Sequence, residues 1–232
     1  MTRWHNVFQP IYHIDANLHK QAAYYEMLLR GEDDRFPAEE FLQTLNNEED
    51  GRRWLEFEKQ SLHELFARHP GIRVHLNLDP VQFAYPSVWT FLKECHDLYG
   101  DHVIIEITER QDAVRDKSDE YFDKAFHKIH ALGFKIALDD VDSGGNTLEF
   151  VKKHLDDISC IKLSLLVFKG MEMETALMFM AAWTAFARDN DLDMVLEAVP
   201  NWRMCACFAG LDHTYIQANI LHAACPITSF EA

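Results

Sequence analysis

Short apolar runs of strand length recur through the chain, and most are separated by stretches with the periodicity of an amphipathic helix. Such β-α alternation is typical of a parallel sheet whose faces are covered by helices. Eight strands of this kind close most economically into a TIM-type (β/α)8 barrel, with a doubly wound open sheet as the alternative. The predicted strands are residues 7–14, 22–29, 72–78, 103–108, 134–140, 159–163, 194–199 and 215–220.

The first two predicted strands differ from the others because too few residues separate them for a crossover helix. A connection this short predicts a hairpin, so one strand near the N-terminus should run antiparallel to the rest. Start and stop signals and helical periodicity predict the remaining elements. These helices span residues 37–46, 50–68, 86–99, 116–132, 147–155 and 173–188, followed by a short helix from Asn201.

Composition restricts the size and the partners of the protein. The chain has 232 residues, 48% hydrophobic and 26% charged, and no linker divides it, so we predict a single domain over residues 1–232. The formal net charge of −16 repels a phosphate backbone, which argues against duplex DNA or RNA as a main partner. A small phosphate ligand stays compatible with this charge if metal ions supply positive charge.

Cysteine usage and hydropathy predict a cytoplasmic protein. The five cysteines include no C-x-x-C pair, which favours reduced thiols over a disulfide framework or a zinc site. The N-terminus lacks the apolar core of a signal peptide, and the longest apolar run, residues 176–187, is too short to cross a bilayer. This run belongs to a Met-rich helix, which we expect either to pack into the core or to contact a partner subunit.

Polar side chains of one chemical kind recur in the second half of several predicted strands. The carboxyl ends of barrel strands meet at one mouth, where barrel enzymes place their sites. A carboxylate within an apolar strand is costly unless it is paired or bound to a metal, and oxygen-rich ligands suit Mg²⁺ or Mn²⁺ better than zinc. The residues are Glu26, Asn77, Glu106, Asp139, Asp140, Lys162, Glu197 and Gln217.

Each of these residues also has a simpler interpretation. A single strand-end Glu or Asn is usually a solvated rim residue, Lys162 can extend its ammonium to solvent, and Gln217 can cap a loop. The neighbouring Asp139 and Asp140 can belong to a turn that caps the helix beginning at Thr147. The complete set, one residue after another at strand ends, favours a site.

Sequence motifs surround these residues and occur in a fixed order over nearly the whole chain. They are Phe8-Gln-Pro-Ile11, Tyr25-Glu-Met-Leu-Leu-Arg30, His75-Leu-Asn-Leu-Asp79, Glu106-Ile-Thr-Glu109, Asp139-Asp-Val-Asp-Ser-Gly144, Ile161-Lys-Leu-Ser164, Leu196-Glu-Ala-Val199 and Tyr215-Ile-Gln217. Together these motifs resemble the EAL domain family, the cyclic di-GMP phosphodiesterases, and the motif that begins at Tyr25 is similar to the signature that gives the family its name.

The resemblance implies a barrel that hydrolyses cyclic di-GMP to linear pGpG with two divalent cations, Mg²⁺ or Mn²⁺, and that forms a homodimer near the loop after Asp140. It implies a role for each motif residue. One metal is assigned to Glu26, Asn77, Glu106 and Asp139, and the second to Asp139, Asp140 and Glu197. Catalysis is assigned to Glu197 as proton acceptor, to Lys162 as the group that orients water, and to Asp139. Substrate contacts are assigned to Arg30, Gln9 and Gln217, and Gln217 also completes the metal or water shell. Glu109 is assigned to support of the loop.

Departures from the family pattern leave three functions open. All the implied metal ligands are present, which favours an active phosphodiesterase with altered support around its site. The alternatives are a receptor that binds cyclic di-GMP without cutting it, and a regulator that binds a protein partner. The departures are Val141 and Asp142 in the loop after the Asp-Asp pair, Ser164 after the Lys motif, Pro200 in place of a Glu, and Ala218 in place of a Gly.

Overall fold

A computed structural model describes residues 4–110 and 119–230 and contains a closed barrel in which β1 to β8 follow one another in sequence order. The predicted barrel is confirmed, and the open sheet is excluded. Each predicted strand is present, although several bounds differ by a few residues. The strands are β1 (His5–Ile14), β2 (Lys20–Arg30), β3 (Val74–Leu78), β4 (Val103–Ile107), β5 (Lys135–Leu138), β6 (Cys160–Ser164), β7 (Asp193–Glu197) and β8 (Thr214–Gln217).

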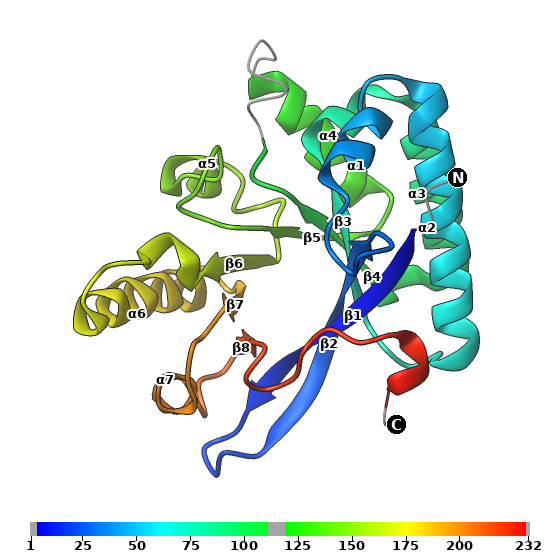
Figure 1. Cartoon of the computed structure of the whole chain (residues 1–232). Coiled ribbons are helices and arrows are strands. Elements are labelled where there is room, and N and C mark those ends of the chain that lie inside the picture. Colours follow the sequence, from blue (N-terminus) through cyan, green and yellow to red (C-terminus); the bar gives the residue numbers. More distant parts are fainter. Residues whose placement is uncertain (1–3, 111–118, 231–232) are drawn as a thin grey trace.

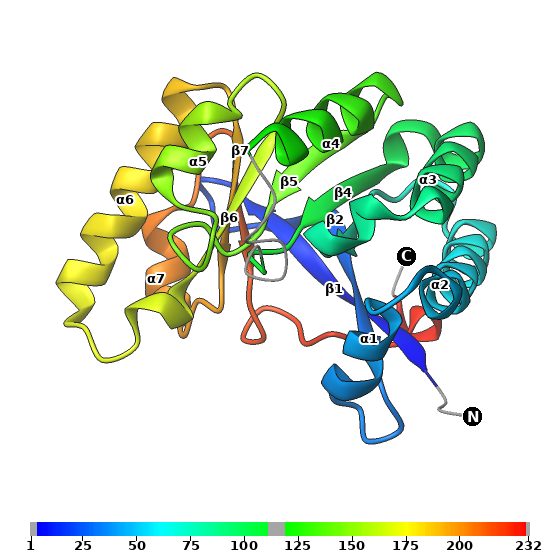
Figure 2. The same cartoon turned by 90° about the horizontal axis from the view of Figure 1, so that it is seen from above.

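Helices cover the outside of the barrel, with α2 and α3 on one side and α6 and α7 on the other (Figures 1 and 2). They connect parallel strands, as the β-α alternation predicts. The start predicted at residue 116 lies outside the described residues. The helices are α1 (Ala38–Thr44), α2 (Glu48–Arg68), α3 (Pro86–Tyr99), α4 (Asp119–Ala131), α5 (Leu148–Lys153), α6 (Met173–Asp189) and α7 (Trp202–Cys207).

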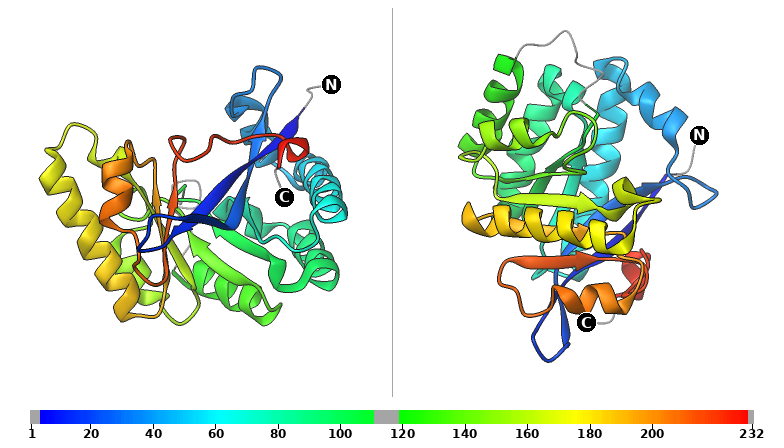
Figure 3. Two further views of the ribbon diagram at one scale, coloured as in Figure 1. Left: turned by 90° about the horizontal axis from the view of Figure 1, so that it is seen from below. Right: turned by 90° about the vertical axis from the view of Figure 1, so that its left-hand side faces the viewer.

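The predicted hairpin is also confirmed, and β1 is the strand that runs against its neighbours. It pairs antiparallel with β2 on one side and with β8 on the other, whereas the remaining neighbours are parallel. The C-terminal segment returns beside this hairpin, where Phe8 and Cys225 exchange backbone hydrogen bonds of 2.8 and 3.0 Å (Figure 3). Phe230 then stacks on Tyr25 at a centroid distance of 4.6 Å, so the end of the chain supports β2.

The strand period of two divides the barrel residues into two sets. On β3, Val74, Leu76 and Leu78 belong to the large core beneath the helices, and all three are buried. The alternate residues His75 and Asn77 face the barrel interior, where their side chains bond to glutamates of neighbouring strands. The same alternation in every parallel strand therefore decides which side chains can meet inside the barrel.

The interior side chains form two layers. The lower layer is mainly apolar or aromatic: Tyr24, His75, Ile104, Ala137, Cys160, Val195 and Tyr215. The upper layer lies two residues further along each strand and is polar: Glu26, Asn77, Glu106, Asp139, Lys162, Glu197 and Gln217. The upper layer thus stands at the carboxyl ends of the parallel strands, on an apolar floor.

Strand bounds differ from the prediction where the chain turns at the mouth. The strand predicted over residues 134–140 ends at Leu138, although the Asp139 N–H still bonds to the Ile107 carbonyl at 3.0 Å. The strand predicted over 215–220 ends at Gln217, before a turn closed by hydrogen bonds to the Ala218 carbonyl. Both strands end where polar side chains replace the apolar run.

The Met-rich helix α6 has one buried and one exposed face. Met180 is fully buried, whereas Met178 is 71% exposed and Phe179 is 42% exposed. Both expected roles for its methionines therefore have a structural counterpart, and homodimerisation stays a prediction. Among the helices of the described residues, none combines the length and apolar character needed to traverse a bilayer.

Candidate functional site

The ammonium of Lys162 lies at the centre of the upper layer and is fully buried. Its Nζ atom lies 2.7 Å from Glu106 Oε1, 2.7 Å from Glu197 Oε1, 3.0 Å from Glu26 Oε2 and 3.5 Å from Asp139 Oδ1. Each carboxylate comes from a different strand or strand end. The sequence alone permitted a Lys162 side chain that reaches solvent, and the structure contradicts that interpretation.

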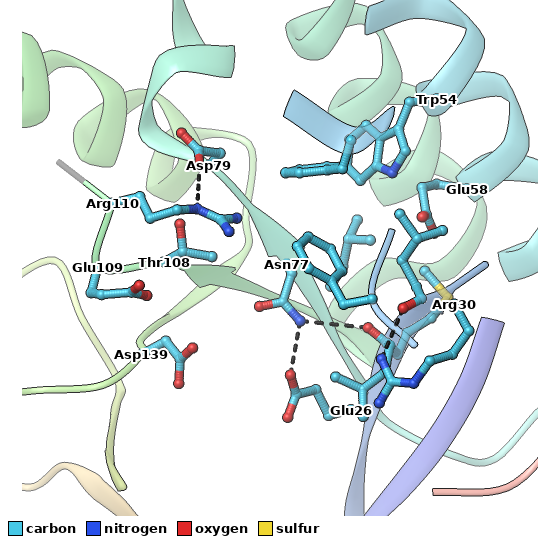
Figure 4. Close-up of a pocket in the computed structure, with 16 residues that line it drawn as sticks. Glu26, Arg30, Trp54, Glu58, Asn77, Asp79, Thr108, Glu109, Arg110 and Asp139 are labelled. Atoms are coloured by element: carbon cyan, nitrogen blue, oxygen red, sulfur yellow. Dashed lines mark hydrogen bonds and ion pairs between the residues drawn. The ribbon is translucent and has the colours of Figure 1, made fainter. Parts of the chain in front are cut away.

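Amide side chains hold Glu26 from two sides. Asn77 Nδ2 donates to Glu26 Oε1 at 2.9 Å, and Gln217 Nε2 donates to Glu26 Oε2. Gln217 Nε2 also lies 3.1 Å from Gln9 Oε1, so β1 and β8 join the same network. The oxygen of Asn77 points away from Glu26, towards the side where Asp139 and Glu109 lie (Figure 4).

The pKa values of the clustered side chains shift in different directions. Burial raises the pKa of Glu106, Asp139 and Glu197, and the neighbouring carboxylates add to the rise. Burial would also raise the pKa of Glu26, but Lys162 and the two amide donors outweigh it and lower this pKa to about 2. Burial opposes the charge of Lys162, yet the surrounding carboxylates raise its pKa well above the ordinary value. One ammonium therefore neutralises the cluster incompletely.

The donor chemistry of this mouth fits divalent cations. Carboxylate oxygens of Glu109, Asp139 and Asp140 all lie within 4.8 Å of one another. Asp139 Oδ1 is buried and accepts no hydrogen bond from the described residues, and the same holds for Gln217 Oε1. Several buried oxygen donors with too little positive charge form the environment that Mg²⁺ and Mn²⁺ prefer.

The loop after Asp140 is well connected despite its departures from the family pattern. Asp142 adopts a φ of 68°, the left-handed region that favours Gly and tolerates Asp. Its N–H bonds to the Asn146 carbonyl at 2.9 Å, and the side chain of Asn146 donates to the Asp139 carbonyl. Val141 is fully buried, and its N–H bonds to the Lys162 carbonyl at 2.9 Å. Neither Val141 nor Asp142 therefore prevents an ordered loop.

Glu109 borders this loop. Gly145 N–H bonds to the Glu109 carbonyl at 3.3 Å, and a Cβ on Gly144 would lie 2.7 Å from the same oxygen. Gly144 also has a φ of 50°, so both space and backbone conformation require Gly there. The contact brings Glu109 beside Asp140, next to the carboxylate cluster.

The other departures lie close to the site without entering the carboxylate network. Ser164 Oγ accepts from the Leu166 N–H at 3.4 Å and caps the short helix that follows β6. Pro200 is exposed, and Ala218 is buried. Ala198, directly after Glu197, has a φ of 52°, a strained value for a residue with a Cβ that the sequence analysis did not anticipate.

A cleft of about 250 Å³ opens beside the cluster, from Glu26 and Asp139 to the first helices (Figure 4). Arg30 lines this cleft, and its Nη1 donates to the Leu29 carbonyl at 2.8 Å. On the opposite side Arg110 Nε donates to Asp79 Oδ2 at 2.7 Å. The lining of the cleft includes three aromatic residues, Phe36, Phe41 and Trp54. The cleft thus combines cations and rings beside the carboxylates.

Two polar residues of this region escaped the sequence analysis. His75 Nδ1 lies 2.9 Å from Glu106 Oε2, with both side chains buried. Burial and the charge of Lys162 lower the pKa of His75 to about 3, which keeps the imidazole neutral. The sequence contained a signal for His75, because it precedes Asn77 by two residues in the same strand and its side chain must therefore face the same side. Glu58, on α2, gave no such signal.

Glu58 provides a prediction about pH. It lines the cleft, is 2% exposed and accepts from Asn6 Nδ2 at 2.9 Å, and burial raises its pKa from 4.5 to about 8. The folded state then holds a proton that the unfolded state releases, so this residue lowers the free energy of unfolding as pH rises from about 4.5 to about 8. Glu58→Gln should remove this contribution, at most about 1.4 kcal/mol per pH unit.

Urea denaturation at about pH 5 and about pH 8 measures the effect. The loss of stability between the two pH values should be smaller in Glu58→Gln than in the wild type. Glu64→Gln, an exposed substitution on the same helix, should behave as the wild type. Parallel pH profiles for Glu58→Gln and Glu64→Gln would show that Glu58 is ionised in the folded protein.

Comparison with known proteins gives matches of two kinds. A model of the EAL domain family matches residues 2–221. "Probable cyclic di-GMP phosphodiesterase PdeA" of Escherichia coli (strain K12) is 28% identical over 177 residues, which are 72% of this chain and 24% of that protein. The chain therefore spans about a quarter of the length of this relative.

Solved structures agree in fold. BlrP1 of Klebsiella pneumoniae, in a complex with calcium and cyclic di-GMP, superposes with a TM-score of 0.76 at 20% identity, covering 96% of this chain and 56% of that chain. An EAL domain protein from Listeria monocytogenes EGD-e has a TM-score of 0.72 at 19% identity, covering 97% of this chain and 90% of that chain. At such identities the similarity establishes the architecture, and activity requires its own argument.

Proposed function

Because the chain belongs to the EAL domain family, we propose that it is a phosphodiesterase that opens cyclic di-GMP to linear pGpG with the help of two divalent cations. The observation that carries the proposal is the convergence of Glu26, Glu106, Asp139 and Glu197 on Lys162 at the mouth of the barrel. A structural cluster would need enough positive charge to balance its carboxylates. This cluster instead contains more oxygen donors than Lys162 can neutralise, and a cleft opens beside it.

The proposed cation ligands follow from the oxygen donors of the mouth. Glu26, Asn77, Glu106 and Asp139 would hold one ion, and Asp139, Asp140 and Glu197 the other. When bound, such ions offset the charge of a phosphodiester and make an attacking water more acidic. Asp139 suits a position between the two ions, because its buried Oδ1 accepts no hydrogen bond from the described residues and lies 3.5 Å from Lys162 Nζ. Glu109 keeps its proposed role as support for the loop, although its carboxylate lies close enough to join the ligands.

Lys162 and Glu197 are proposed to act on the attacking water. The Lys162 ammonium donates hydrogen bonds and can orient a water oxygen towards phosphorus. Glu197 contacts Lys162 at 2.7 Å, and its pKa is raised by burial, which makes it a better proton acceptor than an ordinary carboxylate. The pair therefore offers a donor that positions the water and a base that removes its proton.

The cleft is proposed to bind the nucleotide. Arg30 is placed to contact a phosphate, and Gln9 and Gln217 extend from the other side of Glu26. Guanine bases stack favourably on aromatic side chains, and the cleft wall contains Phe36, whose side chain is exposed. With a formal net charge of −16, the protein needs such local cations and metal ions to attract a doubly negative ligand.

Incubation of the purified protein with cyclic di-GMP and either Mn²⁺ or Mg²⁺, followed by chromatography of pGpG, tests the function. We expect slow turnover that is faster with Mn²⁺, since Mg²⁺ demands near-ideal octahedral geometry and residues close to the site, Ser164 and Pro200 among them, depart from the family pattern. Asp139→Asn should lose product and should also weaken calorimetric binding of Mn²⁺.

The controls separate the three possible functions. Ser143→Ala, in the loop but outside the proposed ligands, should retain metal binding and turnover. Binding of cyclic di-GMP without product in either metal would identify a receptor. Absence of nucleotide binding would reject both the enzyme and the receptor, and would leave a role in binding a protein partner.

A further inference from the structure

His75 is the one imidazole in the lower, mainly apolar layer of the barrel interior. It pairs in register with Ile104 of β4, and the same layer also contains Ala137 and Val195. Tyr24 packs edge-on against its ring at a centroid distance of 5.4 Å. A polar side chain in these surroundings is costly unless it bonds to a partner, and the partner lies one layer above.

That partner is Glu106, whose two carboxylate oxygens have different neighbours. Oε1 lies 2.7 Å from Lys162 Nζ, on the side of the mouth. Oε2 lies 2.9 Å from His75 Nδ1, on the side of the lower layer. A carboxylate oxygen can only accept, so an ionised Glu106 requires the proton of this contact to lie on Nδ1, and each oxygen of Glu106 is occupied from a defined direction.

We propose that His75 is a positioning residue that restricts Glu106 to cation binding through Oε1 and thereby makes the site favour Mg²⁺ and Mn²⁺ over Ca²⁺. This inference rests on the proposed metal site and adds the cause of its selectivity. Oε2 faces the lower layer, where it contacts His75, whereas Oε1 faces the mouth and retains a lone pair beside the one that accepts from Lys162. A cation at the mouth therefore meets one oxygen of Glu106.

The effect of this restriction depends on the size of the cation. Ca²⁺ takes six to eight oxygen ligands and readily accepts both oxygens of one carboxylate, whereas Mg²⁺ requires six ligands at short, nearly ideal positions. A glutamate fixed to one-oxygen contact suits the smaller ion. Release of Oε2 would allow Glu106 to rotate and offer both oxygens, which would favour Ca²⁺.

A purely structural role for His75 makes a different prediction. If the imidazole only fills the barrel and satisfies a buried oxygen, its loss should lower stability and weaken all cations alike. The Tyr24 ring provides the matched comparison, because it packs in the same layer while its hydroxyl donates to Asp193 Oδ2 at 3.0 Å, away from the proposed ligands. Selectivity between cations, not stability, therefore distinguishes the two roles.

Calorimetric titration of the full chain with Mg²⁺ and with Ca²⁺ tests the proposal in His75→Leu, His75→Asn, His75→Gln and Tyr24→Phe. The amide nitrogen of Asn stands two bonds from Cβ, as Nδ1 of His does, whereas that of Gln stands three bonds away. We expect His75→Leu and His75→Gln to weaken Mg²⁺ binding by about 10- to 100-fold, the usual effect of losing such a support, and to weaken Ca²⁺ binding much less. His75→Asn and Tyr24→Phe should keep the wild-type ratio of the two affinities.

The outcomes separate this inference from the proposed function. If His75→Leu and His75→Gln bind both cations as tightly as the wild type, with the same ratio of Mg²⁺ to Ca²⁺ affinity, the role of His75 is overturned and the metal site stays intact. Equal losses for both cations would do the same. Failure of the wild type to bind either cation would overturn the metal site and the inference together. Rescue by Asn but not by Gln would support a hydrogen bond from the Nδ1 position.

Discussion

Lys162→Met is expected to lower the free energy of unfolding by about 3–5 kcal/mol at neutral pH, the usual cost of removing one partner from a buried ion pair. Lys162 is fully buried, and four carboxylates lie around its ammonium. Without it, these groups repel one another in a region of low dielectric constant, and protonation relieves the repulsion only in part. Met retains most of the volume, so cavity formation contributes little.

Urea denaturation with and without Mn²⁺ measures this prediction. Because a bound cation replaces part of the lost positive charge, Mn²⁺ should stabilise Lys162→Met by more than it stabilises the wild type. Lys169→Met, at an exposed position shortly after β6, is the control and should change neither stability nor the response to Mn²⁺. A Lys162→Met variant as stable as the wild type in the absence of metal would contradict the central position of this ammonium.

Glu197→Gln is expected to reduce turnover of cyclic di-GMP by about 10²- to 10⁴-fold, the range typical for loss of a general base. Gln keeps an oxygen at the position of Glu197 Oε1, 2.7 Å from Lys162 Nζ, but accepts no proton from water. Contacts of the cleft with the nucleotide are unaffected, so the dissociation constant should change little. The substitution therefore separates catalysis from binding.

Single-turnover kinetics and equilibrium binding of cyclic di-GMP, both with Mn²⁺, check this expectation. Glu149→Gln, which changes an exposed carboxylate in the first turn of α5, should leave both quantities unchanged. Turnover by Glu197→Gln at half the wild-type rate or more would exclude Glu197 as the base. Loss of nucleotide binding in this variant would instead indicate that the nucleotide needs the ion that Glu197 is proposed to hold.

The sequence by itself determined the barrel and the side chains that enter it. Strand and helix periods are local properties, and the short connection between the first two strands left no room for a crossover, so one antiparallel strand near the N-terminus followed, which the structure identifies as β1. The period of two also placed Glu106 and Glu197 on the interior face of their strands. Parallel strands in a closed barrel have their carboxyl ends at one mouth, so the polar residues had to converge there.

Tertiary structure alone decided the partners within that mouth. The sequence did not distinguish a Lys162 that reaches solvent from one enclosed by four carboxylates, because those carboxylates come from segments up to 136 residues away. It also left His75 without a role, although His75 and Glu106 meet through the stagger of β3 against β4. Register between strands depends on how the whole barrel closes, and hydrogen bonds in the interior depend on that register. The periodicity of the sequence therefore decides which side chains face the barrel interior, whereas closure of the sheet decides which of these side chains contact one another.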